Sequence, residues 1–89
     1  MFDVMHVKDE DIVYFQKNLR IMRVLLGKTG EEVGSWIGVT KQSISNLERH
    51  RVRMSKPQYI ALRVAFECYV ESLSDEQMKK ALDVFISKS

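Results

Sequence analysis

The sequence predicts an all-helical fold, a compact bundle of about five helices. Apolar residues recur at intervals of three and four along most of the chain, which is the period of one helix face. Two segments, residues 29–32 and 74–77, match the capping box that opens many helices, a Thr or Ser followed three residues later by Glu or Gln. No segment shows the strict alternation of a half-buried strand. These observations favour a helical bundle with no sheet.

The first predicted helix is marked by one apolar stripe, Phe15, Leu19, Met22 and Leu26. Gly27 follows this stripe and suits the end of a helix. Residues 1–14 come before the stripe and carry four acidic side chains and one lysine, so we interpret them as an N-terminal extension.

The next two predicted helices are short. Thr29 caps a helix that turns Val33 and Ile37 inward and ends near Gly38. Thr40 caps the third helix. At about 100° per residue, its apolar side chains fall on one face and its hydrogen-bonding side chains, Lys41, Gln42, Ser45 and Asn46, on the opposite face.

Two longer stripes complete the bundle. Ser55, with Pro57 in the first turn, starts a fourth helix that carries Tyr59, Leu62, Phe66, Tyr69 and Leu73. The capping box at Ser74 opens a last helix with Met78, Ala81, Leu82, Phe85 and Ile86 on one face. We therefore expect one domain over residues 15–73, followed by a C-terminal helix over residues 74–89.

Composition excludes several classes of protein. The 89 residues contain no run near the roughly 18 apolar residues that a membrane span needs, and the acidic N-terminus argues against a signal or transit peptide. Cys68 is the single cysteine, and His6 and His50 stand in no pattern typical of a metal site or a catalytic triad. We expect a cytoplasmic protein that is not an enzyme and that uses no metal or cofactor.

The charge is unevenly distributed along the chain. The net charge is only +2, but residues 15–56 hold nine Lys or Arg against three acids. The flanking segments, residues 1–14 and 57–89, are both net negative. A basic central segment is expected if one surface meets a polyanion such as nucleic acid, although a solvated face would produce it too.

Two short helices joined by Gly38-Val39 have the layout of a helix-turn-helix, whose second helix enters the major groove of DNA. Over residues 15–66 the chain resembles the XRE family of lambda-repressor/Cro-like domains. The resemblance rests on Leu-Arg-x-x-Arg at residues 19–23, Thr-x-Glu-Glu-Val-Gly at 29–34, and Ile-Gly-Val-Thr-x-x-x-Ile-Ser-x-Leu-Glu at 37–48. It implies a lambda-repressor-like fold, with the motif over about residues 29–49, and a sequence-specific transcriptional regulator of double-stranded DNA.

The resemblance also implies roles for individual residues. It implies that the side chains in the first turns of the third helix contact the DNA bases, namely Lys41, Gln42, Ser45 and Asn46. Their chemistry suits this role, because Lys can donate to guanine and Gln or Asn can pair with adenine. It also implies a set of residues that bind the phosphates of the DNA backbone, namely Thr29, Gly30, Ser35, Ser43, Arg49, Arg51 and Arg53. The resemblance implies that Arg23 and Glu48 form an inward salt bridge. The alternative is that both side chains are exposed to solvent.

The chain departs from the family pattern at several positions. Gly30 replaces a Gln that contacts phosphate in many members, and Gly34 replaces a small Ala. His50 replaces the Gly that usually ends the recognition helix, and the loop after it is about two residues longer. Trp36 stands where many members are polar. We expect it at the edge of the core under the N-terminal segment, at Val4, Met5 or Val7, with a partner contact as the alternative.

Family members usually bind palindromic operators as dimers, and we expect this chain to be a repressor that acts as a homodimer on such an operator. The apolar stripe of the last helix, Met78, Leu82, Phe85 and Ile86, is our candidate for a dimer interface, and the alternative is that it folds back onto the fourth helix. A second function remains open. The chain could be a protein-interaction module, such as an antitoxin or regulator subunit, whose main task is to hold a protein partner.

Overall fold

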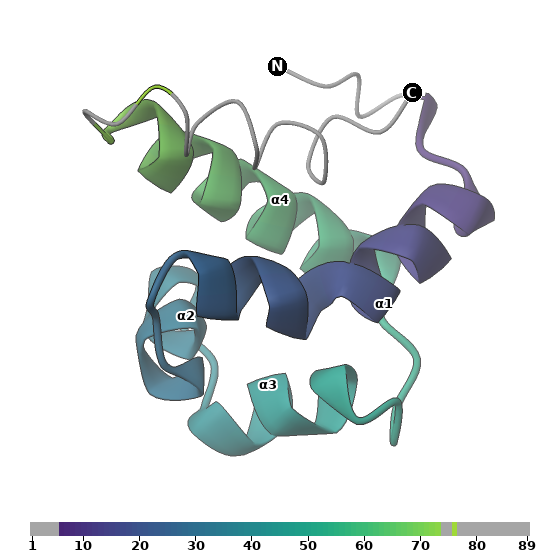
Figure 1. The fold of residues 1–89 in the computed structure, drawn as a ribbon. Helices are drawn as coiled ribbons and strands as arrows, with labels where there is room; N and C mark the ends of the chain where they lie inside the picture. The colour runs from purple at the N-terminus through teal and green to yellow at the C-terminus, as the bar shows by residue number, and fades with distance from the viewer. Residues whose placement is uncertain (1–5, 74–75, 77–89) are drawn as a thin grey trace.

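The computed structural model describes residues 6–73 and 76, and it contains four α-helices within those residues (Figure 1). They are α1 (Asp9–Leu25), α2 (Gly30–Ile37), α3 (Lys41–Glu48) and α4 (Lys56–Glu71). The all-helical prediction is confirmed for the described residues, none of which lies in a strand. The count differs from the predicted five, because the expected last helix falls, apart from Glu76, outside the described residues.

Helix α1 begins at Asp9, six residues before the stripe that marks it in the sequence. Its first turn is acidic, at Asp9, Glu10 and Asp11, and negative charge at a helix N-terminus interacts favourably with the helix dipole. The acidic segment interpreted as an extension therefore contributes the first turns of α1. Ile12, within that segment, is buried in the core.

The predicted caps occur at α2, α3 and α4. Thr29 and Glu32 form a reciprocal capping box, and the Thr40 hydroxyl accepts from the backbone N–H of Ser43 at 3.1 Å. Ser55 forms a second capping box with Gln58. The backbone N–H of Thr29 donates to the Glu32 carboxylate and lowers its pKa below the ordinary value. Local side-chain bonds thus fix where three helices start.

Helices α1 and α2 lie between α3 and α4, with α3 at the bottom of Figure 1 and α4 at the top. The core is formed where they meet, and its most deeply buried side chains are Leu19, Met22, Val33, Ile44, Leu47, Tyr59, Leu62 and Phe66. The Phe15 ring meets Tyr59 and Phe66 edge-on, with centroids 5.3 Å and 6.1 Å apart. This arrangement leaves the outer side of α3 uncovered by the other described helices.

Trp36 lies at the edge of this core, as expected, but its described aromatic neighbours come from α4. Its ring meets Phe66 edge-on at 5.4 Å and stacks on Tyr69 at 5.2 Å. Val4 and Met5, two of the expected covering residues, lie outside the described residues. The rings of Phe66 and Tyr69, three positions apart on α4, hold the Trp36 indole in place. The sequence pattern did not predict these two contacts.

Candidate nucleic-acid interface

Helix α3 is attached to the rest of the protein by one face only. Ile44 and Leu47 are 1% exposed and anchor it in the core. On the opposite side Lys41 and Gln42 are exposed and Ser45 and Asn46 are half-buried. All four predicted base-reading side chains therefore lie on or beside the free face of α3.

Two of these side chains are bonded to each other. The Gln42 side-chain amide donates to the Asn46 carbonyl oxygen, Nε2 to Oδ1, at 3.0 Å. The two residues are one turn apart, so the bond lies along the helix surface. It restricts the rotamers of Gln42 and leaves that residue's Oε1 and second amide hydrogen available to a ligand.

The turn between α2 and α3 sets how closely the two helices pack. Gly38 adopts the left-handed conformation with φ of 73°. At Gly34 a Cβ atom would lie 2.7 Å from the carbonyl oxygen of Val39 and 3.2 Å from that of Thr40. Only glycine permits this close approach of the α2–α3 turn to α2, and an alanine would not fit here.

Arg23 and Glu48, expected as an inward salt bridge, form a bidentate pair in the structure. Arg23 Nε donates to Oε2 at 2.6 Å and Nη2 donates to Oε1 at 3.0 Å. Nη1 also donates to the carbonyl oxygen of Lys28 at 2.9 Å. The hydrogen bond to Glu48 holds the pKa of the Arg23 guanidinium above its ordinary value. The pair ties the end of α3 to α1 and to the α1–α2 turn.

Gln16 is a positioning residue that the sequence did not reveal. It is buried on α1 and reaches residues 31 to 38 positions away in the sequence. Its amide donates to the carbonyl oxygens of Leu47 and Val52 at 3.0 Å and 2.9 Å. Its own oxygen accepts from the backbone N–H of Met54 at 3.0 Å. One side chain therefore holds the end of α3 and the loop after it.

Helix α3 ends in a Schellman motif whose left-handed residue is His50, with φ of 57°. The N–H of His50 bonds the carbonyl oxygen of Leu47, and the N–H of Arg51 bonds that of Asn46. Helix α1 ends in the same way at Gly27. His50 therefore takes the left-handed conformation that glycine usually supplies in this motif.

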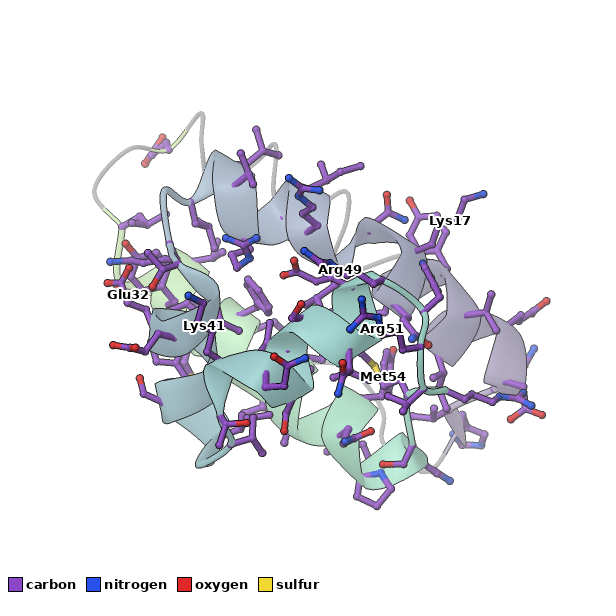
Figure 2. All side chains as sticks on the ribbon, turned by 90° about the horizontal axis from the view of Figure 1, so that it is seen from below. Lys17, Glu32, Lys41, Arg49, Arg51 and Met54 are labelled. Carbon is purple, nitrogen blue, oxygen red and sulfur yellow. The ribbon has the colours of Figure 1, made fainter. Side chains whose placement is uncertain are left out.

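Cationic side chains gather beside α3. Seen from below in Figure 2, Lys41 lies at the left, Arg49 and Arg51 lie near the centre, and Lys17 lies at the upper right. They border two open hollows. The first, which we call the α1–α3 hollow, measures about 430 Å³ and is lined by Arg20, Arg23, Gly27, Lys28, Thr29, Gly30, Lys41, Ser45 and Arg49. The second, the loop hollow, measures about 440 Å³ and is lined by Val13, Gln16, Lys17, His50, Arg51, Val52 and Arg53.

Five of the seven predicted phosphate-binding residues line one of the two hollows. Thr29, Gly30 and Arg49 lie at the α1–α3 hollow, and Arg51 and Arg53 lie at the loop hollow. Ser35 and Ser43 line neither, and both hydroxyls are used locally: Ser35 donates to the Glu32 carbonyl oxygen and Ser43 pairs with Thr40. Arg20 and Lys17 were not among the predicted residues. Both lie on α1, whereas all the predicted phosphate contacts lie between residues 29 and 53.

The predicted dimer-interface residues Met78, Leu82, Phe85 and Ile86 lie outside the described residues. Within the described part of the chain, no helix is both long and apolar enough to cross a membrane. Compared with protein-family models, curated proteins and solved structures, the chain matches none of them. Functional inference therefore rests on the site itself.

Proposed function

We propose that this protein is a sequence-specific double-stranded DNA-binding transcriptional regulator that inserts α3 into the major groove. The observation that carries the proposal is the outer side of α3, which presents the uncharged hydrogen-bonding side chains of Gln42 and Asn46, with one cation-lined hollow beside this helix and another at the loop that follows it. Such a face, with cations near it, supplies both kinds of contact that DNA recognition needs, contacts to base edges in the groove and contacts to phosphates. The order of two short helices, α2 and α3, joined at Gly38 is the layout of a helix-turn-helix and supports the same function.

In this proposal Gln42 is the principal base-reading residue. The bond that Gln42 donates to Asn46 fixes the Gln42 amide, whose remaining acceptor and donor match the N6 amino group and N7 of adenine. Asn46 and Ser45 lie further along α3, where they can contact a neighbouring base pair. Arg51 and Arg53 bind backbone phosphates from the loop hollow and supply affinity without sequence information.

One such motif covers only half of a palindromic operator. We propose that the protein acts as a homodimer, with the two α3 helices one DNA turn apart, about 34 Å. Occupancy of the operator would block access of other proteins to it, so repression is the outcome that we propose. The role requires no metal, cofactor or catalytic step.

Selection of bound sequences from a random duplex pool tests this proposal. We expect a palindromic consensus for the wild-type protein and an altered preference at one position per half-site for Gln42→Ala. Arg51→Ala should leave the consensus unchanged and make the slope of log K against log salt shallower by about 0.9 for the lost phosphate contact. A wild-type protein that enriches no sequence would contradict the proposal.

A second function, a module that holds a protein partner, is favoured by one observation. The outer side of α1 exposes a contiguous apolar row, in which Ile21 is 49%, Val24 59% and Leu25 48% exposed. Rows of this kind often mark protein contacts. A gel shift with genomic fragments and competitor DNA separates the two functions, because specific retention of one fragment requires base reading.

A further inference from the structure

Gly30 lines the α1–α3 hollow and leaves space in its wall. A Cβ atom at this position would lie 3.7 Å from Ile44 Cγ2 and 3.8 Å from Lys41 Cγ. The stem of Lys41 therefore passes alongside Gly30, in space that a longer side chain at residue 30 would compete for. This contact places Lys41 at the wall of the hollow.

Lys41 and Gln42 lie on different faces of α3, which form two rows of side chains along the helix. Lys41, Ser45 and Arg49 all line the hollow, whereas Gln42 and Asn46 do not. The two rows are separated by about 100° around the helix axis. Adjacent residues of the recognition helix thus face different surroundings.

The cations of the hollow differ in what they contact. Arg23 is paired with Glu48, and Lys28 lies 3.7 Å from the Glu32 carboxylate and over the Tyr69 ring, whose hydroxyl raises the pKa of Lys28. For the other three, Arg20, Lys41 and Arg49, the structure shows no acidic partner among the described residues. Three cations around one open space repel each other, and an anion placed between them removes that repulsion.

We propose that the α1–α3 hollow binds a phosphate group through Arg20, Lys41 and Arg49, and that Lys41 is therefore a phosphate-binding residue rather than a base reader. Guanidinium groups offer phosphate two parallel hydrogen bonds, and the Lys41 ammonium supplies a point charge. The phosphate comes either from the DNA backbone, in which case the inference rests on the proposed function, or from a free phosphorylated compound.

A comparison of two neighbouring substitutions tests the assignment of Lys41. Lys41→Gln should leave the selected consensus unchanged, weaken binding to every duplex, and make the salt slope shallower by about 0.9. Gln42→Ala should change the consensus and leave the slope unchanged. Lys8→Gln, which removes one exposed charge at the start of α1 outside the hollow, is the matched control and should change neither.

A further variant tests the hollow without removing a charge. Gly30→Leu fills the space beside Lys41, and its Cβ makes only ordinary contacts, so the fold should be preserved. It should reproduce the uniform loss of affinity seen with Lys41→Gln. A changed consensus for Lys41→Gln with an unchanged slope would overturn the proposal.

The source of the phosphate is decided by a titration without DNA. Wild-type protein labelled with ¹⁵N is titrated with pyrophosphate, and the amide shifts of Gly30, Lys41 and Arg49 are followed. Saturable shifts that Arg20→Gln abolishes would support a phosphate site even if the protein binds no DNA, and would then identify the free compound as the source. No shift at these amides together with no DNA binding would overturn this inference and the proposed function together. DNA binding with an unchanged Lys41→Gln slope would overturn the inference alone.

Discussion

At the scale of single residues, the backbone of His50 stores strain that another residue would relieve. A non-glycine residue in the left-handed conformation costs about 1 kcal/mol or more. We predict that His50→Gly raises the free energy of unfolding by about 1 kcal/mol, measured by urea denaturation.

Gly27 provides the matched control, because it ends α1 with φ of 68° and a Cβ there would meet no atom within 4 Å. Gly27→Ala should lower stability by a similar amount through the backbone alone. If His50→Gly is neutral while Gly27→Ala is destabilising, contacts of the imidazole offset the strain.

The two glycines of α2 should respond in opposite ways to the same substitution. Gly34→Ala places a methyl group against the Val39 carbonyl oxygen, and we predict a loss of about 2 kcal/mol or more although alanine favours helices. Gly30→Ala meets only side-chain atoms at ordinary distances and should be neutral or stabilising by up to about 1 kcal/mol. Thermal melts of the two variants compare them directly, and equal effects would contradict the assignment of close packing to Gly34.

At the scale of the elements, the pair of Arg23 and Glu48 couples α1 to α3. Their side chains are 18% and 9% exposed, so solvent screens part of the attraction. We predict a coupling energy of about 1–2 kcal/mol in a double-mutant cycle with Met at both positions, measured by denaturant melts. Replacing both residues should cost less than the sum of the single losses, because each single variant leaves a partly buried charge unpaired. Additive losses would mean that the pair contributes no coupling.

Gln16 couples α1 to the loop that carries Arg51 and Arg53. Gln16→Leu keeps the volume and leaves two carbonyl oxygens and one N–H without their partner, so we predict a loss of about 2–3 kcal/mol. Hydrogen exchange gives the specific readout: the Met54 amide should exchange faster than the amides of α4 in this variant. Equal acceleration at all amides would indicate a global loss of stability only.

At the scale of the whole molecule, dimerisation is the property that the proposed DNA recognition needs most. We predict that the wild-type protein is a dimer at micromolar concentration, through the stripe Met78, Leu82, Phe85 and Ile86. Leu82→Asp combined with Phe85→Asp should give a folded monomer with much weaker operator binding, because an isologous interface places the same charges opposite each other.

Sedimentation equilibrium and circular dichroism check this prediction. A wild-type monomer at high concentration, or a variant that loses its helical signal, would place the stripe in the core of the monomer instead.

The features predicted correctly from the sequence are those whose cause is local. The caps at Thr29, Thr40 and Ser55 depend on residues three positions away, and the buried stripes depend on a period of 3.6. The bonds of Gln16 span more than 30 positions, and no local pattern indicates them. The hollow beside Lys41 depends on a missing side chain in another helix, at Gly30, so the helical angles of α3 could not show what Lys41 faces.

The bond between Gln42 and Asn46 affects which substitutions α3 can accept without loss of stability. The attachment of α3 to the fold uses the side chains of Ile44, Leu47 and Glu48, whereas the side chains of Gln42 and Asn46 bond, among the described residues, only to each other. Substitution of both together leaves every anchoring contact of the helix in place. Under the proposed function, selection for a new operator can therefore act on these two positions with little loss of stability, and a library randomised at both should consist largely of folded proteins.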